Sequence, residues 1–365
     1  MRALLLLTAA LSITAVAAPL PEFPASAVWS RDISNTTVYP AHPNSGAMIS
    51  ATGGWGNGNK FQIDQSMHVV HVLPANESTV PMLTVAADPS GYTDPDCEPL
   101  GTLKFPMPAG GAIEGSTNYN CDTANNDCHL YVVLDGSRKL YESYLSNCSN
   151  TNSNCTGGQL QSGCVIIWDL NKVYPPYERG DQCTSADAAG FPMASLLFNA
   201  DEVYAASQVT NGDIGHAIRF ILPNPSMAAG VYVHPASHAG GPSGSASKIP
   251  YGSRLRLKST FDINTFSSNI AARIILRTMH KYGIVLSDGG NIALTAEDDM
   301  FTTHKWIEFG FDENNVYLEQ MLVGVPLSAF EVIQTGAQIP LTYDCNINGN
   351  ILTPADFIFI DGYDF

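Results

Sequence analysis

The sequence predicts an all-β dominated fold: a β-sandwich or jelly-roll-like body that carries a few helices and is disulfide-bonded. Three observations support this prediction. Short alternating apolar runs are separated by turn residues, the 365-residue chain contains 31 Gly and 23 Pro, and it has eight cysteines but only 14% charged residues. This composition is typical of a turn-rich extracellular β protein.

Residues 1–18, "MRALLLLTAALSITAVAA", have the features of a cleavable secretory signal: one basic residue, an apolar run and small residues at the end. We therefore expect a secreted, extracellular product. Residues 19–336 should form one β-rich domain, with two packed sub-halves near residue 170 as a variant, and residues 337–365 a C-terminal tail. Four sequons predict a glycoprotein, at Asn35, Asn76, Asn147 and Asn154.

The cysteines are even in number, so disulfides are expected in an oxidising compartment, although the sequence does not select a connectivity. They lie at positions 97, 121, 128, 148, 155, 164, 183 and 345. The formal charge of −17 argues against nucleic acid or an anionic membrane as partner. His234 and His238 are four apart, but Pro235 prevents a helical metal pair, so no metal or cofactor is predicted.

Strand patterns run from Val28 to about Asp169, and we expect them to form antiparallel sheet. Asn199 and Glu202 have capping-box spacing at the start of a short helix. A longer helix is predicted over 267–282, with Gly283 at its C′ position. The following stretch, "GIVLSDGGNIALTA", predicts a hairpin.

The stretch "HLYVVLDGSRKLYESY" predicts a hairpin around Asp135-Gly136 that carries His129 and Glu142. A two-residue loop would place these two side chains directly opposite each other. A four-residue loop would instead place Tyr131 opposite Glu142, yet keep all three on one face, whereas a three-residue loop would separate His129 from Glu142. A solvated cross-strand ion pair and a reactive pair both fit this pattern.

The stretch "RLRLK" places Arg254, Arg256 and Lys258 on one strand face. One explanation is an edge strand protected by charge. The other is an anion-recognition face, to which Arg219 would add if its strand lay alongside. His216 would point to the opposite face from Arg219.

Carboxyl groups provide the second candidate chemistry. Glu114 follows two glycines in "GGAIEGS", and Asp187 lies close to Cys183. Glycosidic bond cleavage needs one protonated and one ionised carboxyl group. A carboxylate beside His129 would raise the pKa of the imidazole and make it an acid, base or orienting group.

The segments "GDQCTSADAAGFP", "GHAIRF", "YVHPASH", "YGSRLRLK" and "KYGIVLSDGG" together resemble a group of secreted bacterial and fungal proteins to which no activity is attached. The resemblance covers roughly residues 28–333, and the tail lies outside it. It implies candidate positions but no roles. These are Glu114, His129, Glu142, Asp187, His216, Arg219, His238, Arg254 and Arg256.

The leading hypothesis is a secreted carbohydrate-active enzyme that cleaves a polysaccharide. Glu114 and Glu142 would be the acid and base, His129 the orienting group and Asp187 a reserve; His216, Arg219, His238, Arg254 and Arg256 would bind substrate. A lyase on uronate polymers is a variant in which an arginine neutralises the substrate carboxylate. The alternative is a noncatalytic glycan-binding or cell-wall-associated protein with a sugar platform of Trp55, Trp168 or Tyr131.

Overall fold

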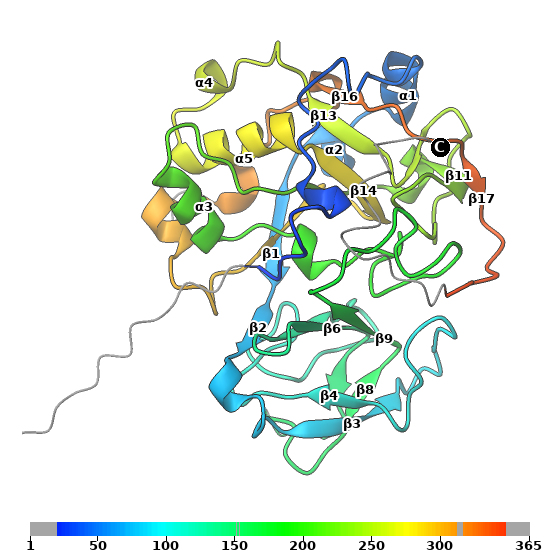
Figure 1. Cartoon of the computed structure of the whole chain (residues 1–365), viewed down its shortest axis with the longest axis vertical. Coiled ribbons are helices and arrows are strands. Elements are labelled where there is room, and N and C mark those ends of the chain that lie inside the picture. Colours follow the sequence, from blue (N-terminus) through cyan, green and yellow to red (C-terminus); the bar gives the residue numbers. More distant parts are fainter. Residues whose placement is uncertain (1–19, 151, 153, 312–316, 348–365) are drawn as a thin grey trace, which may run out of the picture.

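A computed structural model describes residues 20–150, 152, 154–311 and 317–347. It is sheet-rich, as predicted, and four sheets account for its strands (Figure 1). The predicted signal segment and the end of the predicted tail lie outside the described residues. No helix in the described ranges combines the length and the apolar character needed to cross a membrane.

The largest sheet has six strands and mixes parallel with antiparallel pairing. β1 and β15 are parallel, as are β10 and β14, whereas β13 pairs antiparallel with both of its neighbours. The order is β1 (Ile63–Met67), β15 (Leu294–Glu297), β10 (Ile218–Leu222), β14 (Ile284–Gly289), β13 (Arg254–Leu257) and β16 (Phe330–Val332).

Two sequence predictions about pairing are wrong. β14 and β15 do not form a hairpin, because β10 lies between them and pairs with both. The N-terminal strands are not purely antiparallel either, since β2 and β5 pair in parallel, as do β3 and β8. Alternation of apolar residues reveals a strand but not its neighbour, which long-range packing decides.

Two four-stranded sheets lie together in the lower half of Figure 1. Residues of both contribute to one small hydrophobic core. The first contains β2 (Val69–Val72), β5 (Leu130–Leu134), β6 (Lys139–Tyr144) and β9 (Cys164–Asp169). The second contains β4 (Lys104–Pro106), β3 (Met82–Ala87), β8 (Leu160–Ser162) and β7 (Asn147–Cys148).

β5 is buried on both faces, and its side chains alternate between two cores. Leu130 and Val132 belong to the small core, whereas Tyr131 and Val133 belong to the large core that fills the upper half of the molecule. The period of two along a strand produces this division. Residues on the Tyr131 face of this sheet therefore point toward the six-stranded sheet, which is where the candidate site forms.

A three-stranded sheet and the helices complete the fold. The sheet contains β12 (Ile249–Tyr251), β11 (Met227–Tyr232) and β17 (Ile339–Pro340). The α-helices are α1 (Ser45–Thr52), α2 (Gly56–Asn59), α3 (Ala200–Ser207), α4 (Ile263–Phe266) and α5 (Ile270–Lys281). Short 3-10 turns cover Val28–Ser30, Pro74–Asn76, Ala194–Leu196, Asn224–Ser226, Trp306–Phe309, Leu318–Gln320 and Leu327–Ala329.

The helix signals read from the sequence are confirmed, except that the longer helix begins at Ile270, three residues later than predicted. The Asn199 side chain accepts from the backbone of Glu202, and the Glu202 carboxylate accepts from the backbone of Asn199, which is a complete capping box for α3. α5 begins after Asn269, whose side chain caps Ala272, and Gly283 takes a φ of +74° directly after the helix. α5 packs against both α3 and β13.

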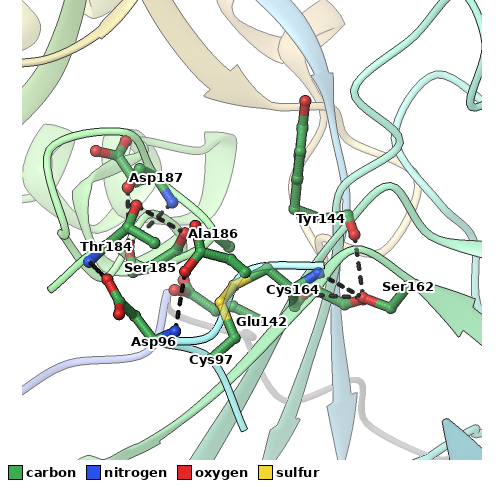
Figure 2. The surroundings of a disulfide bond; sticks show 12 residues. Asp96, Cys97, Glu142, Tyr144, Ser162, Cys164, Thr184, Ser185, Ala186 and Asp187 are labelled. Carbon is green, nitrogen blue, oxygen red and sulfur yellow. Dashed lines mark hydrogen bonds between the residues drawn. A yellow bond between two sulfur atoms is a disulfide. The ribbon is translucent and has the colours of Figure 1, made fainter. Parts of the chain in front are cut away.

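All eight cysteines form disulfides: Cys97–Cys164, Cys121–Cys128, Cys148–Cys155 and Cys183–Cys345. Four bonds of this kind indicate an extracellular or otherwise oxidising environment. The Cys183–Cys345 bond ties the C-terminal segment to the loop that carries Asp187. The Cys97–Cys164 disulfide also lies next to this loop, because Asp96, the neighbour of Cys97, accepts a hydrogen bond from the Thr184 backbone (Figure 2).

Candidate functional site

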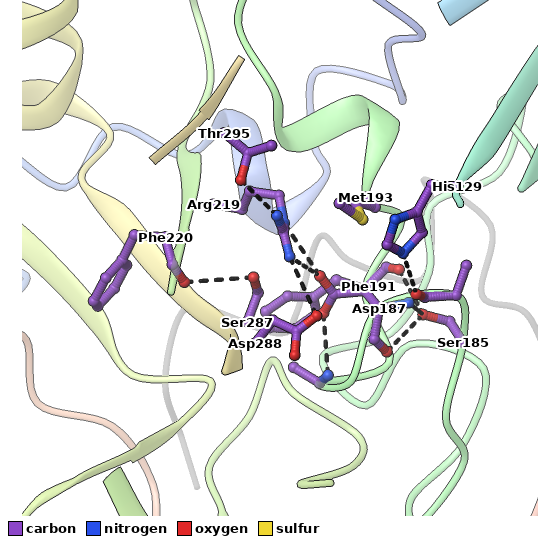
Figure 3. A network of polar contacts seen from close by, with 12 residues as sticks. His129, Ser185, Asp187, Phe191, Met193, Arg219, Phe220, Ser287, Asp288 and Thr295 are labelled. Atoms are coloured by element: carbon purple, nitrogen blue, oxygen red, sulfur yellow. Dashed lines mark hydrogen bonds and ion pairs between the residues drawn. The ribbon is translucent and has the colours of Figure 1, made fainter. Parts of the chain in front are cut away.

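Polar side chains from both halves of the molecule meet where the Tyr131 face of the β2-β5-β6-β9 sheet approaches the six-stranded sheet (Figure 3). The cluster contains an imidazole and a guanidinium group with several carboxyl groups around them. Its members are Asp64, Glu114, His129, Asp187, Arg219 and Asp288. The electrostatic influence of Arg219 reaches five of these groups.

His129 and Glu114 form the first part of the site. Glu114 Oε2 accepts hydrogen bonds from the His129 backbone at 3.0 Å and from Nδ1 at 2.8 Å. The other ring nitrogen, Nε2, lies 3.3 Å from the Ala186 carbonyl oxygen. Because both ring nitrogens face acceptors, the geometry fits the imidazolium, which donates from both.

The charges of this pair reinforce each other. Burial alone would lower the pKa of His129, but the charge and hydrogen bond of Glu114 outweigh it and raise the pKa to about 9. In turn, burial would raise the pKa of Glu114, but the charge and hydrogen bonds of His129 lower it below its ordinary value. At neutral pH the pair is therefore an imidazolium next to a carboxylate.

Arg219 is the second part of the site. Its Nε and Nη2 lie 3.2 and 2.9 Å from Asp187 Oδ2, and Nη1 donates to Thr295 Oγ1 at 2.7 Å. Nη2 is also 3.6 Å from Asp288 Oδ2. Asp187 is fully buried and additionally accepts from the Ala189 backbone. Arg219 therefore holds the Asp187 loop, which presents the Ala186 carbonyl to His129.

Asp288 lies at the more open edge of the cluster, with 30% of its side chain exposed. An irregularity in the β10–β14 register places Asp288, not Ser287, opposite Ile221. Such a bulge redirects the following side chain. Burial and the charge of Asp187 raise the pKa of Asp288 to about 6. The site thus contains Asp288, a carboxyl group that is easily protonated, together with Glu114, a carboxyl group that stays ionised.

Asp64 on β1 is the fourth carboxyl group of the cluster, and it is half-buried. It is paired in register with Thr295, the partner of Arg219. Burial raises the pKa of Asp64, and the charge of Glu114 adds to this effect. The neighbouring Ser66 donates to Glu114 Oε1 at 3.4 Å, a long hydrogen bond. Asp64 and Ser66 therefore line the same side of the site as Glu114.

Glu142 was expected to work with Glu114, but the structure gives it different partners. The hairpin has the four-residue loop, so Glu142 lies opposite Tyr131, on the same face as His129 but further into the core. Its oxygens accept from Trp168 Nε1 at 2.8 Å and from the Ala194 backbone at 2.7 Å. Glu142 is completely buried, and burial raises its pKa to about 7. A group so enclosed does not reach a polymer.

The two other predicted histidines support neighbouring loops and helices. His216 Nε2 lies 3.0 Å from Glu202, in the α3 capping box, and Nδ1 lies 2.8 Å from the Ala217 carbonyl. His238 Nδ1 lies 3.0 Å from the Ala188 carbonyl, so it contacts the Asp187 loop from outside the cluster. His216 thus has no contact with the cluster among these hydrogen bonds, whereas His238 supports the Asp187 loop.

Arg254 and Arg256 do not lie on an edge strand, because β13 has a neighbour on each side. Both are buried. Arg254 donates to the carbonyl groups of Val28 and Tyr282, and Arg256 pairs with Glu331 at 2.6 Å. β14 also separates them from Arg219 on β10. Both guanidinium groups thus join elements inside the protein, so we do not place them in the site.

Asp64, Ser66 and Asp288 are the site residues that the sequence analysis missed. Asp288 belongs to "SDGG", a stretch included in the resemblance, and a carboxyl group before two glycines is the signal that could have identified it. Asp64 gives no comparable signal, because alternating polar residues occur on most half-exposed strands. Among the described residues, no group of three or more His, Cys, Asp or Glu is arranged to hold a metal ion.

Comparison of the chain with protein-family models, curated protein sequences and solved structures gives no match. The resemblance inferred from the sequence segments therefore stays a prediction.

Proposed function

We propose that the protein is a secreted glycoside hydrolase that cleaves a polysaccharide by carboxyl acid-base chemistry, with Asp288 as the acid and Glu114 as the base or nucleophile. The supporting observation is that the surroundings move the pKa values of these two groups in opposite directions: that of Asp288 rises to about 6, and that of Glu114 falls. Environments that separate two carboxyl pKa values in this way are typical of acid-base assignments.

In this mechanism, Asp288 donates its proton to the glycosidic oxygen as the bond to the leaving sugar breaks. The electron pair of that bond stays with the oxygen, and positive charge develops on the remaining sugar ring. Glu114 Oε1 then stabilises or captures this charge, or accepts a proton from attacking water. His129 takes no proton in this scheme, because both of its nitrogens are engaged; it keeps Glu114 ionised and correctly oriented.

Several structural features are compatible with this proposal. The four disulfides fit an extracellular enzyme, and the two four-stranded sheets around the small core fit the predicted β-sandwich as a rigid support. Asp187 and Arg219 then act as positioning residues rather than as catalytic residues, because they face each other. Asp64 is available to hold a substrate hydroxyl or the attacking water beside Glu114.

The lyase variant is less well supported by the same contacts. A lyase needs a cation that meets the substrate carboxylate and a base that removes the neighbouring proton. Arg219 is 2% exposed and occupied by Asp187 and Thr295, and His129 has no nitrogen free to accept a proton. Tyr144 is the tyrosine whose ring centre lies 5.4 Å from that of His129. Burial raises its pKa to about 12, which makes it a poor base at neutral pH.

The aromatic platform expected for the glycan-binding alternative is buried. Trp55, Trp168 and Tyr131 have exposed fractions of 4%, 0% and 0%, so none of them offers a ring face to a sugar. Trp29 and Trp306, the other two of the four tryptophans in the chain, are equally buried. Hydrolysis therefore has more support from the arrangement than binding at an aromatic platform.

The test is release of reducing ends from a panel of polysaccharides by the purified secreted protein. Asp288→Asn and Glu114→Gln should each lower kcat at least about 100-fold, the usual effect of losing a general acid or base. Asp169→Asn is the matched control, because this carboxylate pairs with Lys139 in an ion pair outside the site. No product from any polysaccharide with the wild-type protein, or full activity in both variants, would overturn the proposal. An unsaturated product absorbing in the ultraviolet would identify a lyase instead.

A further inference from the structure

A separate hollow of about 510 Å³ adjoins the cluster on the side of Glu114. Ser66 and Gly115 line it, and these residues connect it to the site: Ser66 donates to Glu114, and the Gly115 backbone donates to the Ser66 carbonyl at 2.9 Å. Its volume falls within the range of roughly 300–1,000 Å³ that is usual for small-molecule sites. The hollow is therefore large enough for a small ligand and is joined to Glu114 through Ser66.

The lining of the hollow combines the two kinds of surface that sugar recognition needs. Asp298, Asp299 and Gln65 provide polar groups for sugar hydroxyls, and Tyr317 provides an aromatic ring that is 49% exposed. The carboxylates are held in place, because Asp299 Oδ2 accepts from the Trp306 backbone at 2.7 Å and Asp298 Oδ1 lies 3.2 Å from His68 Nδ1. Apolar ring faces and fixed polar groups together suit the two faces of a pyranose.

The charge of the hollow restricts the class of sugar. Besides the Tyr317 phenol, its ionisable side chains are Asp298, Asp299 and His68, and the nearest groups of the cluster are Glu114 and Asp64. A uronate or sulfated sugar would bring its anion next to these carboxylates, and like charges in a partly desolvated site repel each other. Uncharged sugars carry no such penalty.

We propose that this hollow is a subsite that binds one or more uncharged sugar residues of the polysaccharide next to the cleavage point, and that it excludes uronates. The subsite rests on the proposed hydrolase function for its place along the substrate. Its binding, however, is measurable without catalysis, so the two proposals can fail separately.

The experiment uses the full chain carrying Asp288→Asn, which keeps the hollow intact but lacks the proposed acid. Labelled neutral hexasaccharides of the cellulose, xylan and mannan types and a hexasaccharide of galacturonate are titrated in turn. We expect at least one neutral probe to bind and the galacturonate probe not to bind. Adding Tyr317→Ala should weaken the neutral binding about tenfold, equivalent to about 1.4 kcal/mol.

The matched control is Tyr92→Ala, which removes a tyrosine that is 46% exposed and lies outside the hollow. It should leave binding unchanged. Equal affinities for Tyr317→Ala and its parent, or preferred binding of the galacturonate probe, would overturn the subsite. If neutral sugars bind in a Tyr317-dependent way but the wild-type protein releases no product from any polysaccharide, the subsite proposal stands and only the hydrolase proposal is overturned.

Discussion

Replacing Glu114 by glutamine removes the negative charge that keeps the buried His129 ring protonated. The new amide still fits the space, and its carbonyl oxygen can still accept a hydrogen bond. What is lost is the charge, against which burial alone lowers the pKa of His129. We therefore expect His129 in Glu114→Gln to be neutral at pH 7, with one ring nitrogen no longer able to donate to its acceptor.

The size of the effect follows from the pKa of His129, which rises from the ordinary value of 6.5 to about 9. Each pKa unit corresponds to about 1.36 kcal/mol, so the pair contributes about 3 kcal/mol to the free energy of unfolding. A raised histidine pKa stabilises the folded state fully below pH 6.5, and this stabilisation is lost as the pH rises through about 9. The variant should therefore be about 3 kcal/mol less stable at pH 6 and close to the wild type at pH 10.

The measurement is urea unfolding of both proteins at pH 6 and pH 10, together with an NMR titration of the His129 ring. Asp135→Asn is the control, because His71 Nδ1 and Asp135 Oδ1 are also 2.8 Å apart, but the pair is more open, with side-chain exposures of 14% and 26%. Such a pair should contribute less than about 1 kcal/mol. A His129 pKa near 6.5 in the wild type, or a stability loss at pH 10 as large as that at pH 6, would refute the reasoning.

Three further predictions concern other groups. Because the pKa of Asp288 is about 6, kcat should fall as the pH rises above 6, and a rate profile that is flat to pH 8 would contradict its role as the acid. Burial raises the pKa of Glu142 from 4.5 to about 7, because it disfavours the ionised carboxylate. The free energy of unfolding should therefore fall by about 3 kcal/mol between pH 4.5 and pH 7 on account of this group. Glu142→Gln, which cannot ionise, should remove this pH dependence from urea-unfolding measurements, and an unchanged dependence would contradict the assignment. The Cys183–Cys345 bond closes a loop over a sequence separation of 162 residues. Changing both cysteines to serine should therefore lower the free energy of unfolding by up to about 5 kcal/mol, because the unfolded chain gains freedom. An unchanged thermal midpoint would show that the bond does not constrain the unfolded chain.

Local patterns in the sequence predicted local structure well. The α3 capping box, the α5 helix with Gly283 after its end, and the two strands around Asp135 all form as expected. These features depend on side chains within a few residues of one another, so the sequence contains most of the information about them. The hairpin loop was the exception, because two- and four-residue loops use the same turn residues.

The membership of the candidate site could be predicted only in part. Glu114, His129, Asp187 and Arg219 were all identified, yet their pairing was not, and Glu142 was assigned to a partner that it does not contact. We expected an exposed charged face at Arg254 and Arg256, but both side chains are buried. A run of alternating residues shows which side chains share a face, but not whether that face meets solvent or another sheet.

The sequence by itself determined that this chain forms strands with a few capped helices, pairs its cysteines, and carries carboxyl, imidazole and guanidinium groups on defined strand faces. Only the tertiary structure decided that β10 enters between β14 and β15, and that the Asp187 loop meets His129. The physical reason is that pKa values and hydrogen-bond partners depend on contacts across 15 to 57 positions of the chain, such as Glu114 with His129 and Ala186 with His129. Such contacts are set by how the sheets pack, and no local periodicity encodes that packing.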